Sequence, residues 1–240
     1  ISQSDSETPT QNTISISAAD GATAEVTLDG VNIDESGTGN NYNGEGAVTA
    51  VSVSPDEDST VIIELDGENT VKSGRGHAGV ENNDSNLVIQ DENKVSGSLD
   101  ATGGAYAAGI GGGRDGDGSD IVINGGVVTA NGGSDAAGIG GGMRANGKNI
   151  TITGGTVNAT GGEYGAGIGG GTLANGSGIR ISGGEVTVMG GTSAASIGGG
   201  SDYGVAYKSG DQYRGRGSDV TISGDAHVKV IKNALMIIND

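Results

Sequence analysis

A seven-residue motif recurs four times in the second half of the chain, and this repetition constrains the fold more than any other feature. The first copy, residues 107–113, reads Ala-Ala-Gly-Ile-Gly-Gly-Gly, and close variants stand at residues 136–142, 165–171 and 194–200. A fixed period of this size is typical of a solenoid, in which each repeat forms one coil and buries its apolar face only against neighbouring coils. The isoleucines at the centre of the four copies are spaced by 29 residues and are Ile110, Ile139, Ile168 and Ile197.

Within one repeat the apolar residues alternate with period two, which predicts short β-strands that are separated by glycine pairs. The 51 glycines leave no stretch suited to a long helix. We therefore expect an all-β fold, a parallel β-helix with three short strands per coil. The inward-facing columns that the period predicts are Ile121/Ile123, Ile150/Ile152, Ile179/Ile181 and Val220/Ile222 on the first strand; Leu99, Val128, Val157 and Val186 beside Ala101, Ala130, Ala159 and Val188 on the second; and Ala108, Ala137, Ala166 and Ala195 beside the isoleucine row on the third.

The same pattern continues upstream in a less regular form and extends the prediction to about seven coils. The segments 26–30, 63–67 and 88–91 align with residues 121–125, and the body is then about 30 Å long at the spacing of paired strands. We expect residues 1–20 to be an N-terminal linker and cap and residues 21–240 to be a single β-helix domain. Within that domain, 21–100 are irregular acidic coils, 101–200 are regular 29-residue repeats, and 201–240 hold a long loop, the last coil and an apolar cap at 234–238.

The charge distribution limits the classes of partner. Residues 1–100 hold 19 acidic and 3 basic residues, whereas residues 101–240 hold 11 acidic and 9 basic residues, giving a net charge of −18 for the chain. This sign disfavours nucleic acid and anionic membranes. The chain has no cysteine, no apolar run long enough to span a membrane and no start typical of a signal peptide. The composition indicates a bacterial extracellular protein, secreted or attached to the cell surface, and we expect a monomer as an isolated domain.

The acidic half suggests a cation site. In the alignment above, three aspartates form a column at the end of the first strand, about 5 Å apart, where like charges repel. Calcium accepts such carboxylates at flexible geometry. In the alternative interpretation the same residues cap turns by accepting backbone N–H groups. The column consists of Asp29, Asp66 and Asp91, followed by Asn124.

A second candidate for calcium is the glycine-spaced acidic loop that spans residues 115–120. It places carboxylates at its first, third and sixth positions and resembles the first half of a calcium loop, but it lacks the distal glutamate of an EF-hand. The other copies of the repeat do not keep it. Its candidate ligands are Asp115, Asp117 and Asp120.

The tyrosines suggest a carbohydrate-binding edge. All six fall in predicted loops or turns, and Tyr106 and Tyr164 occupy the same repeat position two coils apart, about 10 Å along one edge. Rows of glycine beside them, which include Gly111 and Gly140, predict a flat floor of exposed backbone on which a sugar chain could lie between aromatic rings. In the alternative interpretation, the glycines serve tight coil geometry and the tyrosines pack over turn ends.

The long insertion of residues 201–217 adds 12 residues to the standard coil and is rich in the side chains of binding hot spots. Insertions on solenoids often map to the binding face, although a long loop can also be neutral variation. Its candidate carbohydrate-binding residues are Tyr203, Tyr207, Tyr213 and Arg214.

The upstream segments Val-Thr-Leu-Asp-Gly-Val-Asn-Ile (26–33) and Val-Ile-Ile-Glu-Leu-Asp-Gly-Glu-Asn-Thr (61–70) resemble a clostridial family of secreted carbohydrate-binding proteins. That resemblance covers about residues 20–100 and implies a right-handed parallel β-helix that binds Ca²⁺ and attaches to cellulose or acidic plant polysaccharide. The Gly-Gly-x-Val-x-Ala-x-Gly-Gly copies resemble repeats of surface proteins from Gram-positive gut bacteria. The nearly neutral, glycine-saturated repeat half departs from the first family.

Together these features predict a non-catalytic, extracellular polysaccharide-binding β-helix, assisted by Ca²⁺. One alternative is a structural stalk or adhesin segment of a larger surface protein. A polysaccharide lyase is the minority alternative, since Lys72 or Arg75 could serve as its base beside calcium. His77 and His227 have no catalytic partner at a readable spacing.

Overall fold

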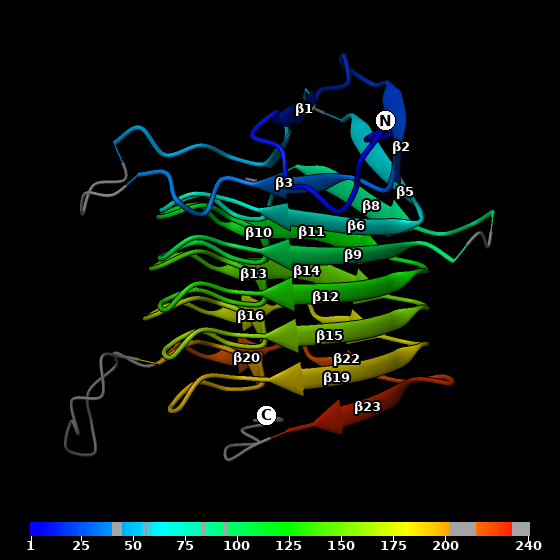
Figure 1. The fold of residues 1–240 in the computed structure, drawn as a ribbon. Coiled ribbons are helices and arrows are strands. Elements are labelled where there is room, and N and C mark those ends of the chain that lie inside the picture. Colours follow the sequence, from blue (N-terminus) through cyan, green and yellow to red (C-terminus); the bar gives the residue numbers. More distant parts are fainter. Residues whose placement is uncertain are drawn as a thin grey trace.

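The computed structural model describes residues 1–39, 45–54, 56, 58–82, 85–93, 96–201 and 215–231. These residues form three parallel sheets, each of which takes one strand or strand pair from every one of seven stacked coils (Figure 1). We name the sheets 1, 2 and 3 in the order in which the chain visits them.

The strand bounds fall into three groups, one for each sheet. Sheet 1 contains β1 (Ile14–Ile16), β4 (Val51–Val53), β7 (Val80–Asn82), β10 (Ile110–Gly111), β13 (Ile139–Gly140), β16 (Ile168–Gly169) and β20 (Ile197–Gly198). Sheet 2 contains β2 (Thr23–Asp29), β5 (Thr60–Asp66), β8 (Asn86–Gln90), β11 (Gly118–Ile123), β14 (Gly147–Ile152), β17 (Gly176–Ser177), β18 (Arg180–Ile181), β21 (Gly217–Ser218) and β22 (Thr221–Ile222). Sheet 3 contains β3 (Asn32–Asp34), β6 (Glu68–Lys72), β9 (Ser98–Thr102), β12 (Val127–Asn131), β15 (Thr156–Thr160), β19 (Glu185–Met189) and β23 (His227–Val230).

The winding is right-handed. In Figure 1 the strands of sheet 3 run from right to left on the near side while successive coils advance downward from the N-terminus. This is the hand that a parallel crossover almost always takes. The predicted fold, a right-handed parallel β-helix of about seven coils with three short strands each, is confirmed.

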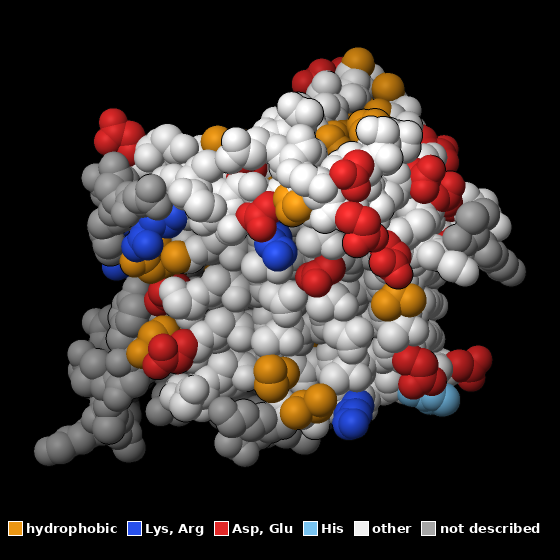
Figure 2. Space-filling model, viewed as in Figure 1, with side chains coloured by type: hydrophobic (Ala, Val, Ile, Leu, Met, Phe, Trp, Pro, Cys, Tyr) orange, Lys and Arg blue, Asp and Glu red, His pale blue; other side chains and the backbone are white. Residues whose placement is uncertain are grey.

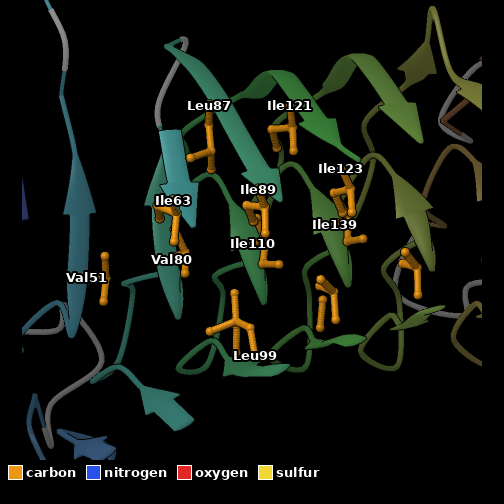
Figure 3. Close-up of a cluster of buried hydrophobic side chains, with 14 of the residues drawn as sticks. Val51, Ile63, Val80, Leu87, Ile89, Leu99, Ile110, Ile121, Ile123 and Ile139 are labelled. Atoms are coloured by element: carbon orange, nitrogen blue, oxygen red, sulfur yellow. The ribbon is translucent and has the colours of Figure 1, made fainter. Parts of the chain in front are cut away.

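The core is the interior of the coils, and most of the predicted columns fill it (Figure 3). The predicted alanine column of Ala108, Ala137, Ala166 and Ala195 lies outside this cluster, and Ala108 packs in a separate one with Ala78 and Ala107. The isoleucine row pairs in register through β10, β13, β16 and β20, and the Leu99 column pairs in register through β9, β12, β15 and β19. Parallel strands with period-two alternation place like residues above one another, so each layer buries its aliphatic side chains on those of the next. The columns thin out in the last coil, where Ile222 is 45% exposed.

The upstream alignment is confirmed for its first two segments and is wrong in register from the third segment onward. The structure pairs Val26 with Ile63, Ile63 with Ile89 and Ile89 with Ile123, whereas the alignment had placed Val88 in this row. Leu87 and Ile89 are both fully buried, and a shift by one residue would turn both of them outward and Val88 inward. Two branched aliphatic residues therefore decide the register against the single Val88.

Residues 1–13 lie across the first end of the β-helix. Ser2 bridges to Asp29 at the edge of sheet 2, and Thr10 bridges to Ile33 at the edge of sheet 3. The chain then forms β1, which is the edge strand of sheet 1 and pairs with β4 of the second coil. The segment thus covers two of the three free edges at this end, which is how exposed strand edges are protected from further pairing.

The other end is formed by β20 to β23, and the predicted apolar cap at 234–238 lies outside the described residues. Within the described part of the chain, no helix has the length and hydropathy needed to cross a membrane.

Candidate binding site

A cluster of two arginines and one tyrosine combines Arg75 and Tyr106, from the corner between sheets 3 and 1, with Arg114, from the segment between β10 of sheet 1 and β11 of sheet 2. Arg75 Nη2 donates a hydrogen bond of 2.7 Å to the Tyr106 hydroxyl, and the Arg75 guanidinium lies 4.5 Å from the centre of the Tyr106 ring. Arg114 lies over the same ring at 5.4 Å. Both distances fall within the range of cation–π attraction, so one half-buried aromatic ring orients two cations. We call Arg75, Tyr106 and Arg114 the arginine–tyrosine clamp.

The local backbone explains why these three residues meet. On both sides of this corner, paired residues of successive coils are 30 positions apart in the sequence, as in Lys72 with Thr102 and Val80 with Ile110. Tyr106 therefore occupies the position that Gly76 holds one coil earlier. Both adopt positive φ, +86° at Gly76 and +78° at Tyr106, which is uncommon for a bulky residue. The Arg114 N–H donates to the Gly76 carbonyl at 2.7 Å and fixes Arg114 beside the earlier corner. The clamp is therefore assembled from two successive coils.

A histidine–carboxylate pair stands in the same corner of the third coil. His77 Nδ1 lies 2.9 Å from Glu81 Oε2 and 2.7 Å from Thr49 Oγ1, and the Ala78 N–H also donates to Glu81 Oε2 at 3.0 Å. The hydrogen bond to Glu81 raises the pKa of His77, against the smaller opposing effect of burial. Neither histidine stands alone in the fold, although the sequence spacing showed no catalytic partner: His227 Nδ1 likewise lies 2.5 Å from Glu185 Oε1.

The clamp is a local concentration of positive charge on a strongly acidic protein. Figure 2 shows Lys and Arg side chains gathered at the left edge of the view, at the height of β6 and β9, where these strands lead into the corner. Arg114 also pairs with the exposed Asp115 at 3.4 Å. Acidic side chains are otherwise frequent on the N-terminal half of the face shown. The two guanidinium groups therefore make this corner less negative than the rest of the face shown.

The two predicted binding tyrosines occupy equivalent corners, but they do not form a continuous aromatic edge. Between Tyr106 and Tyr164 lies Asp135, which is only 5% exposed. Its carboxylate accepts hydrogen bonds from Ser134 Oγ at 2.7 Å and from Thr172 Oγ1 at 3.3 Å. Tyr164, like Tyr106, is half-buried. The Tyr106 ring orients guanidinium groups, so it acts with them and not as a bare stacking platform.

The predicted floor of exposed glycine backbone is wrong. Gly111, Gly140, Gly169 and Gly198 are buried, because the corner segments before and after each two-residue strand close over it, as in the bond from Ala108 N–H to Gly112 O at 3.0 Å. A Cβ added at Gly140 would lie 2.1 Å from the Gly169 carbonyl oxygen. The glycines therefore serve the tight stacking of coils, as the alternative interpretation held.

The predicted aspartate column exists only in part. Asp29 and Asp66 are paired in register on β2 and β5. Asp91 is displaced by one residue from this row, because β5 and β8 pair Glu64 with Gln90. Asp91 instead accepts the Gly97 N–H at 3.2 Å, and Asp66 accepts the Asn93 side-chain amide at 2.7 Å. Asp91 thus caps a turn, and the column of three carboxylates does not form.

The acidic loop of residues 115–120 spreads its carboxylates toward different partners. Asp117 accepts the Asn146 N–H at 2.7 Å and is bonded by Lys148 Nζ, while Asp120 accepts the Asn149 side-chain amide at 3.0 Å. Burial alone would raise the pKa of Asp117, but hydrogen bonds from Lys148 and Asn146 outweigh it and hold that pKa below its usual value. Asp115 faces Arg114, as described above.

In the described part of the chain, no group of three or more His, Cys, Asp or Glu residues is placed to hold a metal ion. Calcium binding remains a prediction from the sequence. The remaining predicted carbohydrate-binding residues, Tyr203, Tyr207, Tyr213 and Arg214, lie outside the described residues.

Sequence reasoning missed Arg114, Glu81 and the pairing of His77. A histidine followed four residues later by a glutamate was visible, but in an extended strand such residues share a face about 13 Å apart and meet only where a turn intervenes. Arg114 stands where later repeats carry Met143 and Thr172, so a departure from the repeat was the available signal.

The comparisons with known proteins agree with this architecture. A protein-family model described as a β-helix repeat matches residues 96–114, 121–143, 150–172 and 179–201. These segments begin just before β9 of the third coil and continue through the regular repeats. Neither the curated proteins nor the solved structures contain a significant match. The chain is a parallel β-helix protein, and this class includes both enzymes and non-enzymes.

Proposed function

We propose that this protein is a non-catalytic, extracellular polysaccharide-binding β-helix, secreted or held at a cell surface. The observation that carries the proposal is the arginine–tyrosine clamp, in which Tyr106 orients two guanidinium groups at one corner. A guanidinium presents five N–H donors in a fixed fork, which suits the paired oxygens of sugars. Because the ring fixes Arg75 in advance, less side-chain entropy is lost when a ligand binds.

The neighbouring face of sheet 3 supports a linear polymer that runs along the helix axis. Thr102, Asn131 and Thr160 are the outward residues of β9, β12 and β15 nearest to the corner, and they pair in register. Successive coils repeat at about 4.8 Å, so hydroxyl and amide groups recur in line at that interval. A chain of sugar units that starts at the clamp meets these groups in turn and then reaches the corner of Tyr164.

The test compares two double variants with a matched control. Arg75→Gln with Arg114→Gln removes both cations while keeping polar side chains, and Tyr106→Ala with Tyr164→Ala removes both rings. We expect each to weaken retention on the polysaccharide that the unmodified protein binds, by about tenfold or more, as for hot-spot residues. Affinity electrophoresis and pull-down against soluble and insoluble polysaccharides measure this, with thermal melting to check the fold.

Arg180→Gln is the control, because Arg180 is exposed on sheet 2 away from the clamp. Equal retention by all three variants would exclude the corner as the binding site. The same panel also tests a lyase, because cleavage of a uronic-acid polymer by elimination produces an unsaturated product that absorbs ultraviolet light.

A second candidate function is a structural segment of a larger surface protein. It is favoured by the buried glycine rows and by the many backbone hydrogen bonds between successive coils of the described residues, which make a stiff rod without needing any ligand. A protein that melts at high temperature and is retained by no polysaccharide of the panel would support this candidate over carbohydrate binding.

A further inference from the structure

Four Asn–Gly steps lie in the described residues, at 124–125, 131–132, 146–147 and 175–176. We infer that Asn124 is a site of spontaneous deamidation and that the fold protects the other three asparagines. This modification is independent of the proposed carbohydrate binding.

The chemistry needs only the chain and water. The backbone nitrogen of the glycine attacks Cγ of the asparagine, a new N–C bond forms, and the side-chain amide nitrogen leaves as ammonia. Water then opens the resulting succinimide at either carbonyl and yields aspartate or isoaspartate. Glycine favours the step because it has no side chain to hinder the approach. The attacking nitrogen must be free of its own hydrogen bond, and the asparagine side chain must be free to turn toward it.

Three of the four glycine N–H groups are held by the next coil. Gly132 donates to Thr160 O at 2.9 Å, Gly147 donates to Asn175 O at 3.0 Å, and Gly176 donates to Arg216 O at 2.9 Å. These bonds continue the strand ladders or extend them by one residue. Attack by any of these nitrogens therefore requires local opening of two coils.

The side chains of the same asparagines are also fixed. Asn146 Oδ1 accepts the Asn175 N–H at 3.0 Å, and Asn175 Oδ1 accepts the Arg216 N–H at 2.7 Å. Asn131 Nδ2 donates to Asp100 Oδ1 at 3.2 Å. Rotation of these side chains toward the following nitrogen breaks an existing hydrogen bond in each case.

At Asn124 the following glycine nitrogen is not held by the next coil, and the asparagine side chain is held only weakly. It lies in the turn between β11 and β12 and is exposed, and the Gly125 N–H makes no hydrogen bond within the described residues. Its side chain is held by one contact, in which the exposed Thr153 Oγ1 donates to Asn124 Oδ1 at 2.7 Å. Reaction here leaves the strand ladders on either side intact.

The other coils show what this turn accepts in place of asparagine. The positions one and two coils later are Thr153 and Ser182, each followed by a glycine pair as Asn124 is. Asn124→Thr is therefore a conservative variant that the fold already uses at this turn. Deamidation to aspartate adds a negative charge next to the coil of Asp91, and isoaspartate adds one carbon to the backbone of the turn.

The test is incubation of the folded protein in mildly alkaline heavy-oxygen water, followed by peptide mapping with mass spectrometry. We expect conversion at Asn124 to be at least about tenfold faster than at Asn131, Asn146 or Asn175, the factor that corresponds to about 1.4 kcal/mol of local opening. In denaturant the four sites are expected to react at similar rates. The Asn124→Thr variant should lose the fast ammonia release and keep the slow background.

Two results would overturn the inference. One is equal or slower conversion at Asn124 in the folded protein. The other is an undiminished advantage of Asn124 in denaturant, which would assign the rate to neighbouring residues and not to the fold.

Discussion

The first three coils and the regular repeats close their corners by different means. In the first three coils buried polar side chains tie the backbone together: Asn69, 2% exposed, accepts the Val31 N–H and donates to the carbonyls of Leu28, Asp66 and Ser98. In the repeats, glycines let the backbone of one coil press directly on that of the next, as at Gly140 and Gly169. A buried side chain thus ties the turn into sheet 3 in the early coils, whereas missing side chains let the strands of sheet 1 stack in the repeats.

The difference has a functional side. A corner closed by side chains tolerates variation in coil length and leaves room for residues such as His77 and Glu81. A corner in which glycine backbones of successive coils are in contact has almost no space for a side chain. Glu81 stands in the outward row where the later coils carry Gly111 and Gly140. The arginine–tyrosine clamp lies between the third and fourth coils, where this row of sheet 1 changes from Glu81 to Gly111.

The largest expected loss of stability comes from placing a side chain where glycines of successive coils are in contact. Gly140→Ala places a Cβ 2.1 Å from the Gly169 carbonyl oxygen at a φ of +130°, so two coils must separate. We expect a loss of about 4 kcal/mol or more in the free energy of unfolding, or failure to fold. Denaturant titration measures it, with Gly37→Ala as the control, since no atom lies within 4 Å of a Cβ built there. Similar stability of the two variants would show that the glycine rows are dispensable.

The next largest loss of stability is expected from removing the buried side chain of Asn69, which ties three coils together. Asn69 pairs in register with Leu99, so Asn69→Leu imitates the apolar column of the repeats. We expect the variant to be less stable by about 3 kcal/mol, because the buried backbone groups of four residues lose their partner. Thr70→Val, on the same strand but facing outward, is the control and should change little. A stabilising Asn69→Leu would mean that the two kinds of corner are interchangeable.

A smaller effect sharpens the comparison through pH. Glu81 raises the pKa of His77 above the usual 6.5, so protonated His77 favours the folded state. This contribution is complete below the unfolded-state pKa and is lost as pH rises through the folded-state pKa. The melting temperature should therefore fall more on passing from mildly acidic to mildly alkaline buffer in the unmodified protein than in Glu81→Gln. Parallel pH profiles would contradict a role for this pair in stability.

The smallest expected effect concerns calcium. The carboxylates of Asp66, Asp91 and Asp117 each accept a hydrogen bond from the protein. We therefore expect the melting temperature to be the same in EDTA and in excess Ca²⁺. A clear rise with Ca²⁺ would establish a native-state site by mass action and confirm the calcium prediction made from the sequence.

The fold was predictable from the sequence because it depends on a strict period and on alternation, and both are visible in residues such as Ile110 and Val128. The register of the irregular coils was harder, since Val88 and Ile89 compete for one inward position. The clamp was only partly visible. Arg75 and Tyr106 are 31 residues apart, and their contact depends on the one extra residue in that coil step and on the positive φ of Tyr106.

The interlocking of successive corners also fixes how the molecule can grow or shrink. Removal of residues 133–161, one full period, joins Gly132 to Gly162 and recreates the junction that Gly133 makes in the intact chain. The rod then shortens by one coil, about 4.8 Å, with its three sheets in register, and Tyr106 and Tyr164 become neighbours. Removal of one residue fewer leaves an extra residue at the corner, which the intact chain already accommodates in its 30-residue step from Lys72 to Thr102. The length of the rod therefore changes in whole coils, while each corner can absorb a residue.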